Sequence, residues 1–127
     1  MYSYTAISWH KARNEGIMGT SNIDLLPYGE KQKNVLRKYV SLLQGLPNIN
    51  RIILFGSYAR MEYRIQSDFD ILAVTDSPVS REERGELCSQ LEEMGADLIF
   101  YTEEQWKTSD CMLTQQIRKD GLLIWHR

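Results

Sequence analysis

Residues 51–74, RIILFGSYARMEYRIQSDFDILAV, decide the fold of this chain. The apolar, β-branched run at 51–55 predicts a strand that leads into Gly56. Gly56 permits a sharp turn, and residues 57–62 predict the first turns of a helix. Residues 68–74 open with an Asp-x-Asp motif and continue as an apolar run, which predicts a buried strand. The stretch therefore predicts a strand, a turn, a helix and a second strand in succession.

The Gly56-Ser57 pair is the place where we expect a phosphate group to bind. A helix that begins here presents unpaired backbone N–H groups and a partial positive charge to a triphosphate. The Ser57 hydroxyl adds one more donor. A Gly-Ser pair after a strand is, taken alone, most often an ordinary turn. The phosphate interpretation therefore depends on the motif that follows it ten residues later.

The Asp-x-Asp motif predicts a site for a divalent metal. Side chains two apart on a strand share a face, so Asp68 and Asp70 are expected to point the same way, and Phe69 the other way. Two carboxylates held side by side repel, and the pKa of one rises unless a cation lies between them. Mg²⁺ takes one or two protein carboxylates and completes its shell with water and phosphate oxygens. Two such ions, about 3.5 to 4 Å apart, could hold both reacting oxygens of an in-line phosphoryl displacement.

Asp97 is a third candidate carboxylate. It opens the apolar run 97–101, which follows an amphipathic helix and predicts another strand. Asp97 would lie beside Asp68 and Asp70 if the two strands were neighbours in the sheet. Hydrophobic periodicity does not reveal the order of strands, so this juxtaposition is conditional.

The rest of the chain predicts helices that pack on a sheet. A capping pattern at Ser80 and Glu83 begins one helix, and a second such pattern at Thr102 and Gln105 precedes Trp106, which is expected to pack inward. The remaining predicted elements are helices at 29–44, 80–95 and around 113–119, and strands at 97–101 and 122–125. This order is that of an α/β or α+β fold, with a mixed sheet of about four strands.

Composition predicts one domain. The chain has 127 residues, 43% of them hydrophobic and 25% charged, which is ordinary for a globular protein. No apolar stretch reaches the roughly 18 residues that a membrane-spanning helix needs, and the first residues lack the apolar core of a signal peptide, so we expect a cytoplasmic protein. A net charge of −2 argues against a long nucleic acid as partner. Self-association is left open.

Residues 56–74 resemble the signature of the polymerase-beta-like nucleotidyltransferase superfamily, and most closely that of the minimal nucleotidyltransferases. Those proteins are the small partners of HEPN-domain toxins in toxin-antitoxin pairs. The resemblance spans about residues 30 to 125 and implies the nucleotidyltransferase fold. It departs from the family pattern at Met61, where many relatives carry a glycine. The nucleotide-binding positions of the family fall on Gly56, Ser57 and Arg60. The catalytic and metal-binding carboxylates fall on Asp68, Asp70 and, by order in the chain, Asp97.

The resemblance implies a Mg²⁺-dependent enzyme that moves AMP from ATP to a hydroxyl. The first hypothesis for this acceptor is a tyrosine of a HEPN-domain toxin. Asp97 would then also take the proton of the attacking hydroxyl. Two alternatives stay open: a binding module that neutralises its partner by occlusion, and transfer to a small molecule such as an aminoglycoside. We expect a single domain over 1–127, with a core at 28–125 and an N-terminal extension of uncertain structure at 1–27.

Overall fold

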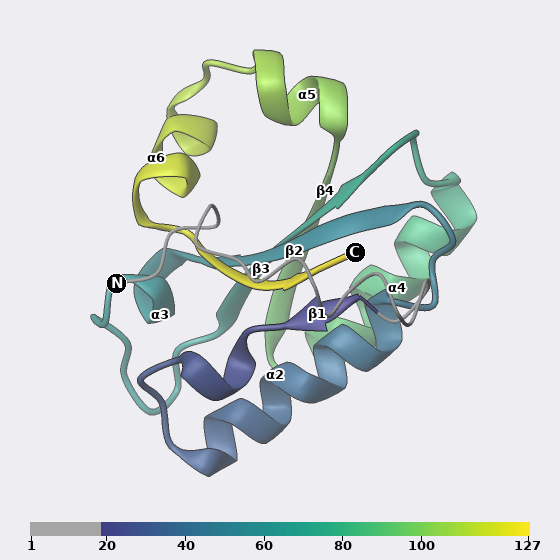
Figure 1. The fold of residues 1–127 in the computed structure, drawn as a ribbon. Helices are drawn as coiled ribbons and strands as arrows, with labels where there is room; N and C mark the ends of the chain where they lie inside the picture. Colours follow the sequence, from purple (N-terminus) through teal and green to yellow (C-terminus); the bar gives the residue numbers. More distant parts are fainter. Residues whose placement is uncertain (1–18) are drawn as a thin grey trace.

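The computed structural model describes residues 19–127, which form a five-stranded sheet with helices on both faces (Figure 1). The predicted extension at 1–27 lies for the most part outside the described residues. The strands are β1 (Thr20–Ser21), β2 (Ile49–Phe55), β3 (Phe69–Thr75), β4 (Ala96–Thr102) and β5 (Leu122–His126). The helices are the 3-10 turn η1 (Ile23–Leu25), α2 (Glu30–Leu43), α3 (Gly56–Ala59), α4 (Arg81–Glu93), α5 (Glu103–Thr108) and α6 (Met112–Asp120).

The sheet is mixed, as predicted. Its strand order is β1-β5-β2-β3-β4, in which β3 and β4 run parallel and the other neighbours run antiparallel. The four predicted strands correspond to β2, β3, β4 and β5. The fifth strand, β1, has two residues and pairs at the sheet edge with β5. A strand of this length carries no hydrophobic periodicity, so it could not be predicted from the sequence.

Two layers of helices enclose the sheet. Figure 1 shows α2 and α4 on one face and α5 and α6 on the other. Alternate residues of each strand point to opposite faces, so neighbouring residues of β3 enter different clusters: Ile71 packs on the α2 side, and Leu72 packs with Trp106 on the α5 side. Trp106 is 4% exposed, which confirms its predicted inward packing. Among residues 19–127, no helix has the length and apolar character needed to cross a bilayer.

Local signals set the ends of the helices. The Ser80 hydroxyl accepts a hydrogen bond from the Glu83 backbone at the start of α4, and Gly95, with φ +87°, follows its end. Thr102 and Gln105 form the predicted capping box of α5. The helix predicted at 57–62 is wrong in length, because α3 makes a single turn and ends at Ala59.

Candidate active site

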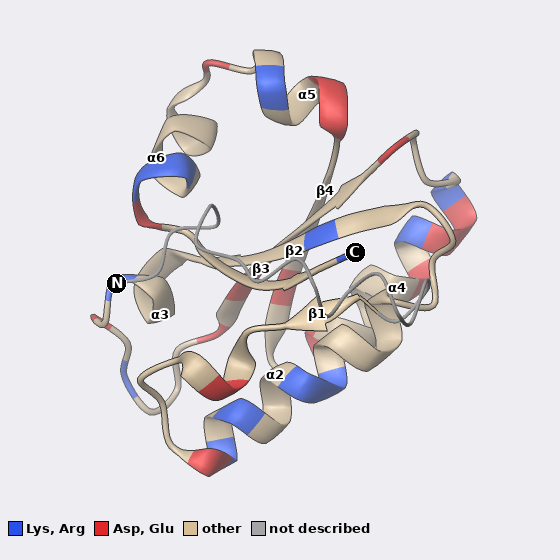
Figure 2. Ribbon diagram, viewed as in Figure 1, with Lys and Arg blue, Asp and Glu red and all other residues tan. Residues whose placement is uncertain are grey.

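The parallel pairing of β3 with β4 brings the candidate carboxylates together. Asp70 is the register partner of Asp97, and Asp68 immediately precedes β3. The condition attached to Asp97, that its strand should neighbour the strand of the Asp-x-Asp motif, is therefore met. Figure 2 shows acidic segments side by side where β3 and β4 begin.

Asp70 and Asp97 point to the same face of the sheet. By two-residue alternation Asp70 shares a face with Leu72, and Asp97 shares a face with Ile99. Leu72 belongs to the buried cluster under α5 and α6, and Ile99 packs against that cluster. Asp70 is half-buried, whereas Asp68 and Asp97 are exposed. The pair thus offers one shielded carboxylate and one that solvent or a second molecule can reach.

Gly56 lies directly against the Asp70 carboxylate. Phe55, the residue before it, is the register partner of Asp70 across β2 and β3. A Cβ placed on Gly56 would lie 2.0 Å from Asp70 Oδ2 and 2.8 Å from its Cγ, far inside van der Waals contact. Gly56 also has a φ of +76°, which L side chains rarely adopt. Glycine is therefore required here both by the backbone conformation and by the close approach of the carboxylate.

The surroundings of Asp70 raise the pKa of its carboxyl group. Burial is the largest cause, the negative charges of Asp97 and Asp68 add to it, and the positive charge of Arg60 opposes it. The repulsion predicted for carboxylates held side by side is therefore present and adds to the larger effect of burial. A cation beside these carboxylates would favour the ionised form of Asp70, so positive charge would be bound favourably at this position.

The donor set fits a hard divalent cation that a nucleotide helps to hold. Within residues 19–127, no three His, Cys, Asp or Glu side chains form a ready-made metal cluster. Mg²⁺ does not need one, because it binds through one or two carboxylates and takes its other ligands from water and substrate phosphates. The paired oxygens of Asp70 and Asp97, with Asp68 next to them, supply ligands of that type.

The Gly56-Ser57 pair forms a tight turn at the end of β2. The Arg60 N–H donates to the Gly56 carbonyl at 3.1 Å, and the Glu62 N–H donates to the Ser57 carbonyl at 2.8 Å. A helix of one turn has a small macrodipole, so a phosphate here would depend on the free N–H groups and the Ser57 hydroxyl more than the predicted longer helix implied. The turn leads to Met61, whose φ of +59° is the left-handed conformation that glycine adopts at no steric cost.

Arg60 lies near the carboxylates and is held at the surface. Its Nε donates to Glu62 Oε1 at 3.1 Å, and its positive charge lowers the pKa of Asp70. Both side chains of this ion pair are more than a third exposed, at 67% for Glu62 and 35% for Arg60, so the pair contributes little to stability. Arg60 is thus available to a bound anion.

Sequence reasoning missed the aromatic cluster beneath the turn. It consists of Tyr28, Tyr58, Tyr63 and Phe69. These residues have no regular spacing and come from three separate segments, so no sequence signal indicates that they meet.

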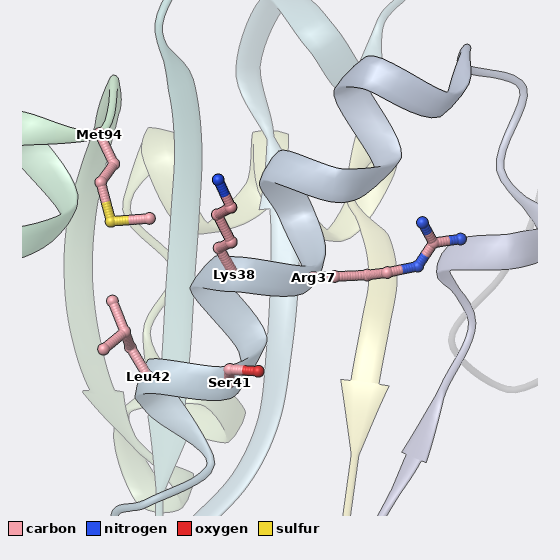
Figure 3. Close-up of a pocket in the computed structure, with 5 residues that line it drawn as sticks. All are labelled: Arg37, Lys38, Ser41, Leu42 and Met94. Carbon is pink, nitrogen blue, oxygen red and sulfur yellow. The ribbon is translucent and has the colours of Figure 1, made fainter.

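A groove of about 410 Å³ lies elsewhere, on the α2 side of the sheet. It is lined by Arg37, Lys38, Ser41, Leu42 and Met94. Figure 3 shows Leu42 and Met94 facing each other across it, whereas Arg37 extends away, toward its ion-pair partners Asp24 and Glu30. The candidate carboxylates Asp70 and Asp97 point to the opposite face, so this groove is not part of their site.

Comparison with known families gives a match over most of the chain. A family model described as "Polymerase beta, Nucleotidyltransferase" matches residues 37–127. Two proteins of Methanocaldococcus jannaschii, both provisionally named protein adenylyltransferases, are 42% identical over 48 residues and 43% identical over 47 residues. These matches cover 38% and 35% of this chain, and 49% and 47% of the relatives. The chain thus spans about half the length of the curated relatives it matches.

Two solved structures share the fold. One is a crystal structure of a toxin-antitoxin with AMP-PNP, with 25% sequence identity and a TM-score of 0.55 over 74% of this chain and 73% of that chain. The other is a structure from Sulfolobus solfataricus, provisionally named a nucleotidyltransferase, with 25% identity and a TM-score of 0.50 over 74% of this chain and 76% of that chain.

Proposed function

The chain belongs to the polymerase-beta nucleotidyltransferase family, and from this premise we propose that it is a Mg²⁺-dependent enzyme that transfers AMP from ATP to a hydroxyl of a partner protein. The observation that carries the proposal is the register pair of Asp70 and Asp97, with the Asp70 carboxylate packed against Gly56. This arrangement joins a negatively charged metal-binding position to a turn with free donors, which are the two parts that nucleotidyl transfer requires.

Each candidate residue has a role in this reaction. Gly56 and Ser57 hold the β- and γ-phosphates through backbone N–H groups and the Ser57 hydroxyl, and Arg60 adds positive charge. Asp68, Asp70 and Asp97 would hold Mg²⁺, one ion or two, which supplies charge neutralisation at the phosphates when bound. These assignments rest on the family positions and on the juxtaposition of the residues.

The chemical step is an in-line displacement. The acceptor oxygen forms a bond to the α-phosphorus of ATP, the bond from that phosphorus to the bridging oxygen of the β-phosphate breaks, and pyrophosphate leaves. Asp97 takes the proton of the acceptor hydroxyl, a role that its exposure permits because an acceptor can reach it.

The acceptor we propose is a tyrosine of a HEPN-domain toxin, which makes the chain an antitoxin. The names of the Methanocaldococcus jannaschii relatives support transfer to protein, and the similar toxin-antitoxin structure with AMP-PNP supports an adenine nucleotide as donor. The net charge of −2 favours a protein acceptor over a long nucleic acid. We further propose a single domain, in which the buried Ile23 and Leu26 join the core predicted at 28–125, and a cytoplasmic location.

Intact-mass spectrometry tests this proposal. The chain is mixed at low ratio with a HEPN-domain toxin as the proposed acceptor, ATP and Mg²⁺, in parallel with the Asp68→Asn, Asp70→Asn double variant. We expect the toxin to gain the mass of one or more AMP groups with the native chain only. If its mass stays unchanged while both forms suppress the toxin at equal stoichiometry, the chain acts by occlusion. A parallel reaction with an aminoglycoside as acceptor tests the small-molecule alternative.

A further inference from the structure

The turn that carries Gly56 and Ser57 is too short to keep its shape by itself. Helix α3 has four residues, and helices of this length are unstable in isolation. Its first residue, Gly56, has a φ of +76°, and Met61, two residues after its end, has a φ of +59°. Tertiary contacts must therefore hold the turn in place.

Aromatic stacking supplies part of that hold. The Tyr58 ring, which α3 contributes, stacks on Tyr63 with centroids 4.2 Å apart and on Phe69 with centroids 3.9 Å apart, both nearly parallel at 11° and 15°. Phe69 lies between Asp68 and Asp70 in the sequence. The stack thus ties the turn to the strand that carries the Asp-x-Asp motif.

Tyr28 holds the backbone of the same turn. Its hydroxyl donates a buried hydrogen bond of 2.7 Å to the Tyr58 carbonyl, which also accepts the Met61 N–H at 3.1 Å. Its ring makes edge contacts with Tyr58 and Tyr63, at centroid distances of 6.0 and 5.9 Å. Tyr28 is 7% exposed, and burial is the largest cause that raises its pKa to about 12, so the hydroxyl stays a donor at neutral pH.

We propose that Tyr28 is a positioning residue, which holds the Gly56–Ala59 turn in the shape that receives the nucleotide. The proposal rests on the proposed function and adds to it a residue that lies ahead of α2 and outside the matched family region of 37–127. Tyr28 acts through the Tyr58 carbonyl and does not itself contact the phosphates.

Tyr39 offers a matched control. Its hydroxyl also donates to a backbone carbonyl, that of Met94, at 2.6 Å, and its buried ring makes an edge contact with Phe69 at 5.7 Å. Tyr28→Phe and Tyr39→Phe therefore remove the same chemical group from the same kind of bond. Only the first bond has its acceptor in the Gly56–Ala59 turn.

The test compares ATP binding, in the presence of Mg²⁺, by the wild-type chain and the two variants. We expect the dissociation constant of ATP to rise about fivefold in Tyr28→Phe, the effect of one lost hydrogen bond on the geometry of the site. In Tyr39→Phe it should stay within about twofold of wild type. Amide hydrogen exchange of residues 56–61, measured without nucleotide, should become faster in Tyr28→Phe alone.

Two outcomes would overturn the proposal. Equal ATP affinity and equal exchange in the two variants would reduce Tyr28 to a core residue. Failure of Tyr28→Phe to fold, while Tyr39→Phe folds, would assign the hydroxyl to global stability. A wild-type chain that binds no ATP would count against the proposed function, whereas the exchange measurement would still decide whether Tyr28 holds the turn.

Discussion

Replacing Gly56 by alanine should disturb the turn and the Asp70 carboxylate together. The new Cβ would lie 2.0 Å from Asp70 Oδ2, so either the carboxylate or the turn must move. Holding alanine at a φ of +76° costs about 1 to 2 kcal/mol, and relieving the overlap costs about 1 to 3 kcal/mol more. We expect a loss of about 2 to 5 kcal/mol in the free energy of unfolding.

Urea denaturation measures this loss, with Gly85→Ala as the matched control. Gly85 lies within α4 and has no atom within 4 Å of its added Cβ, so alanine there should stabilise the protein by about 0.5 to 1 kcal/mol. The same Gly→Ala change thus has opposite signs at the two positions. Calorimetry with ATP and Mg²⁺ should also show weaker binding for Gly56→Ala, because the displaced carboxylate no longer faces Asp97.

A double-mutant cycle separates the two causes. Asp70→Ala removes the carboxylate and leaves only its Cβ, 3.1 Å from the new Cβ at position 56. The pair Gly56→Ala, Asp70→Ala should therefore be more stable than the two single effects predict, by about 1 kcal/mol or more. Additive effects within about 0.3 kcal/mol would refute the close approach of Asp70 to Gly56.

Three further predictions concern the same region. Burial, together with the charges of Asp97 and Asp68, raises the pKa of Asp70, so the folded protein keeps this proton to higher pH than the unfolded chain does. The stability that this proton contributes is full below the ordinary pKa of 3.8 and is lost as the pH rises through the raised pKa of the folded protein. Asp70→Asn should remove this loss, so the excess of its unfolding temperature over that of wild type should grow across this pH range and then level off; an unchanged pH profile would contradict the assignment. Met61→Gly should stabilise the protein by about 0.5 to 1 kcal/mol in urea denaturation, because glycine adopts the φ of +59° without strain and Met61, at 46% exposed, loses little buried contact. The control variant Met112→Gly, in the first turn of α6, should destabilise the protein by a similar amount. Ser57→Ala should weaken ATP binding by about 1 kcal/mol, and chelation of Mg²⁺ should weaken it further in calorimetry; equal affinity with and without Mg²⁺ would rule out the metal role.

Local chemistry determined most of the elements. The β-branched run before Gly56, the capping pairs at the starts of α4 and α5, and the glycine after α4 act through neighbours within a few residues, so their structural meaning can be predicted from sequence alone. For the same reason the sequence placed Asp70 at the start of a strand. The length of α3 escaped prediction, because methionine itself does not indicate a left-handed conformation; the sign at this position was the glycine that many relatives carry in place of Met61.

Tertiary structure alone decided which of these elements meet. The parallel neighbours β3 and β4 set Asp70 opposite Asp97, and the contact of Asp70 with Gly56 follows from the pairing of β2 with β3. Tyr28 reaches the Tyr58 carbonyl across 30 residues of chain. Periodicity reports which face of an element is buried, but it carries no information about which other element covers that face, because any partner of suitable shape removes the same apolar surface from water. The candidate residues could thus be identified from the sequence, whereas long-range packing determined that they lie together.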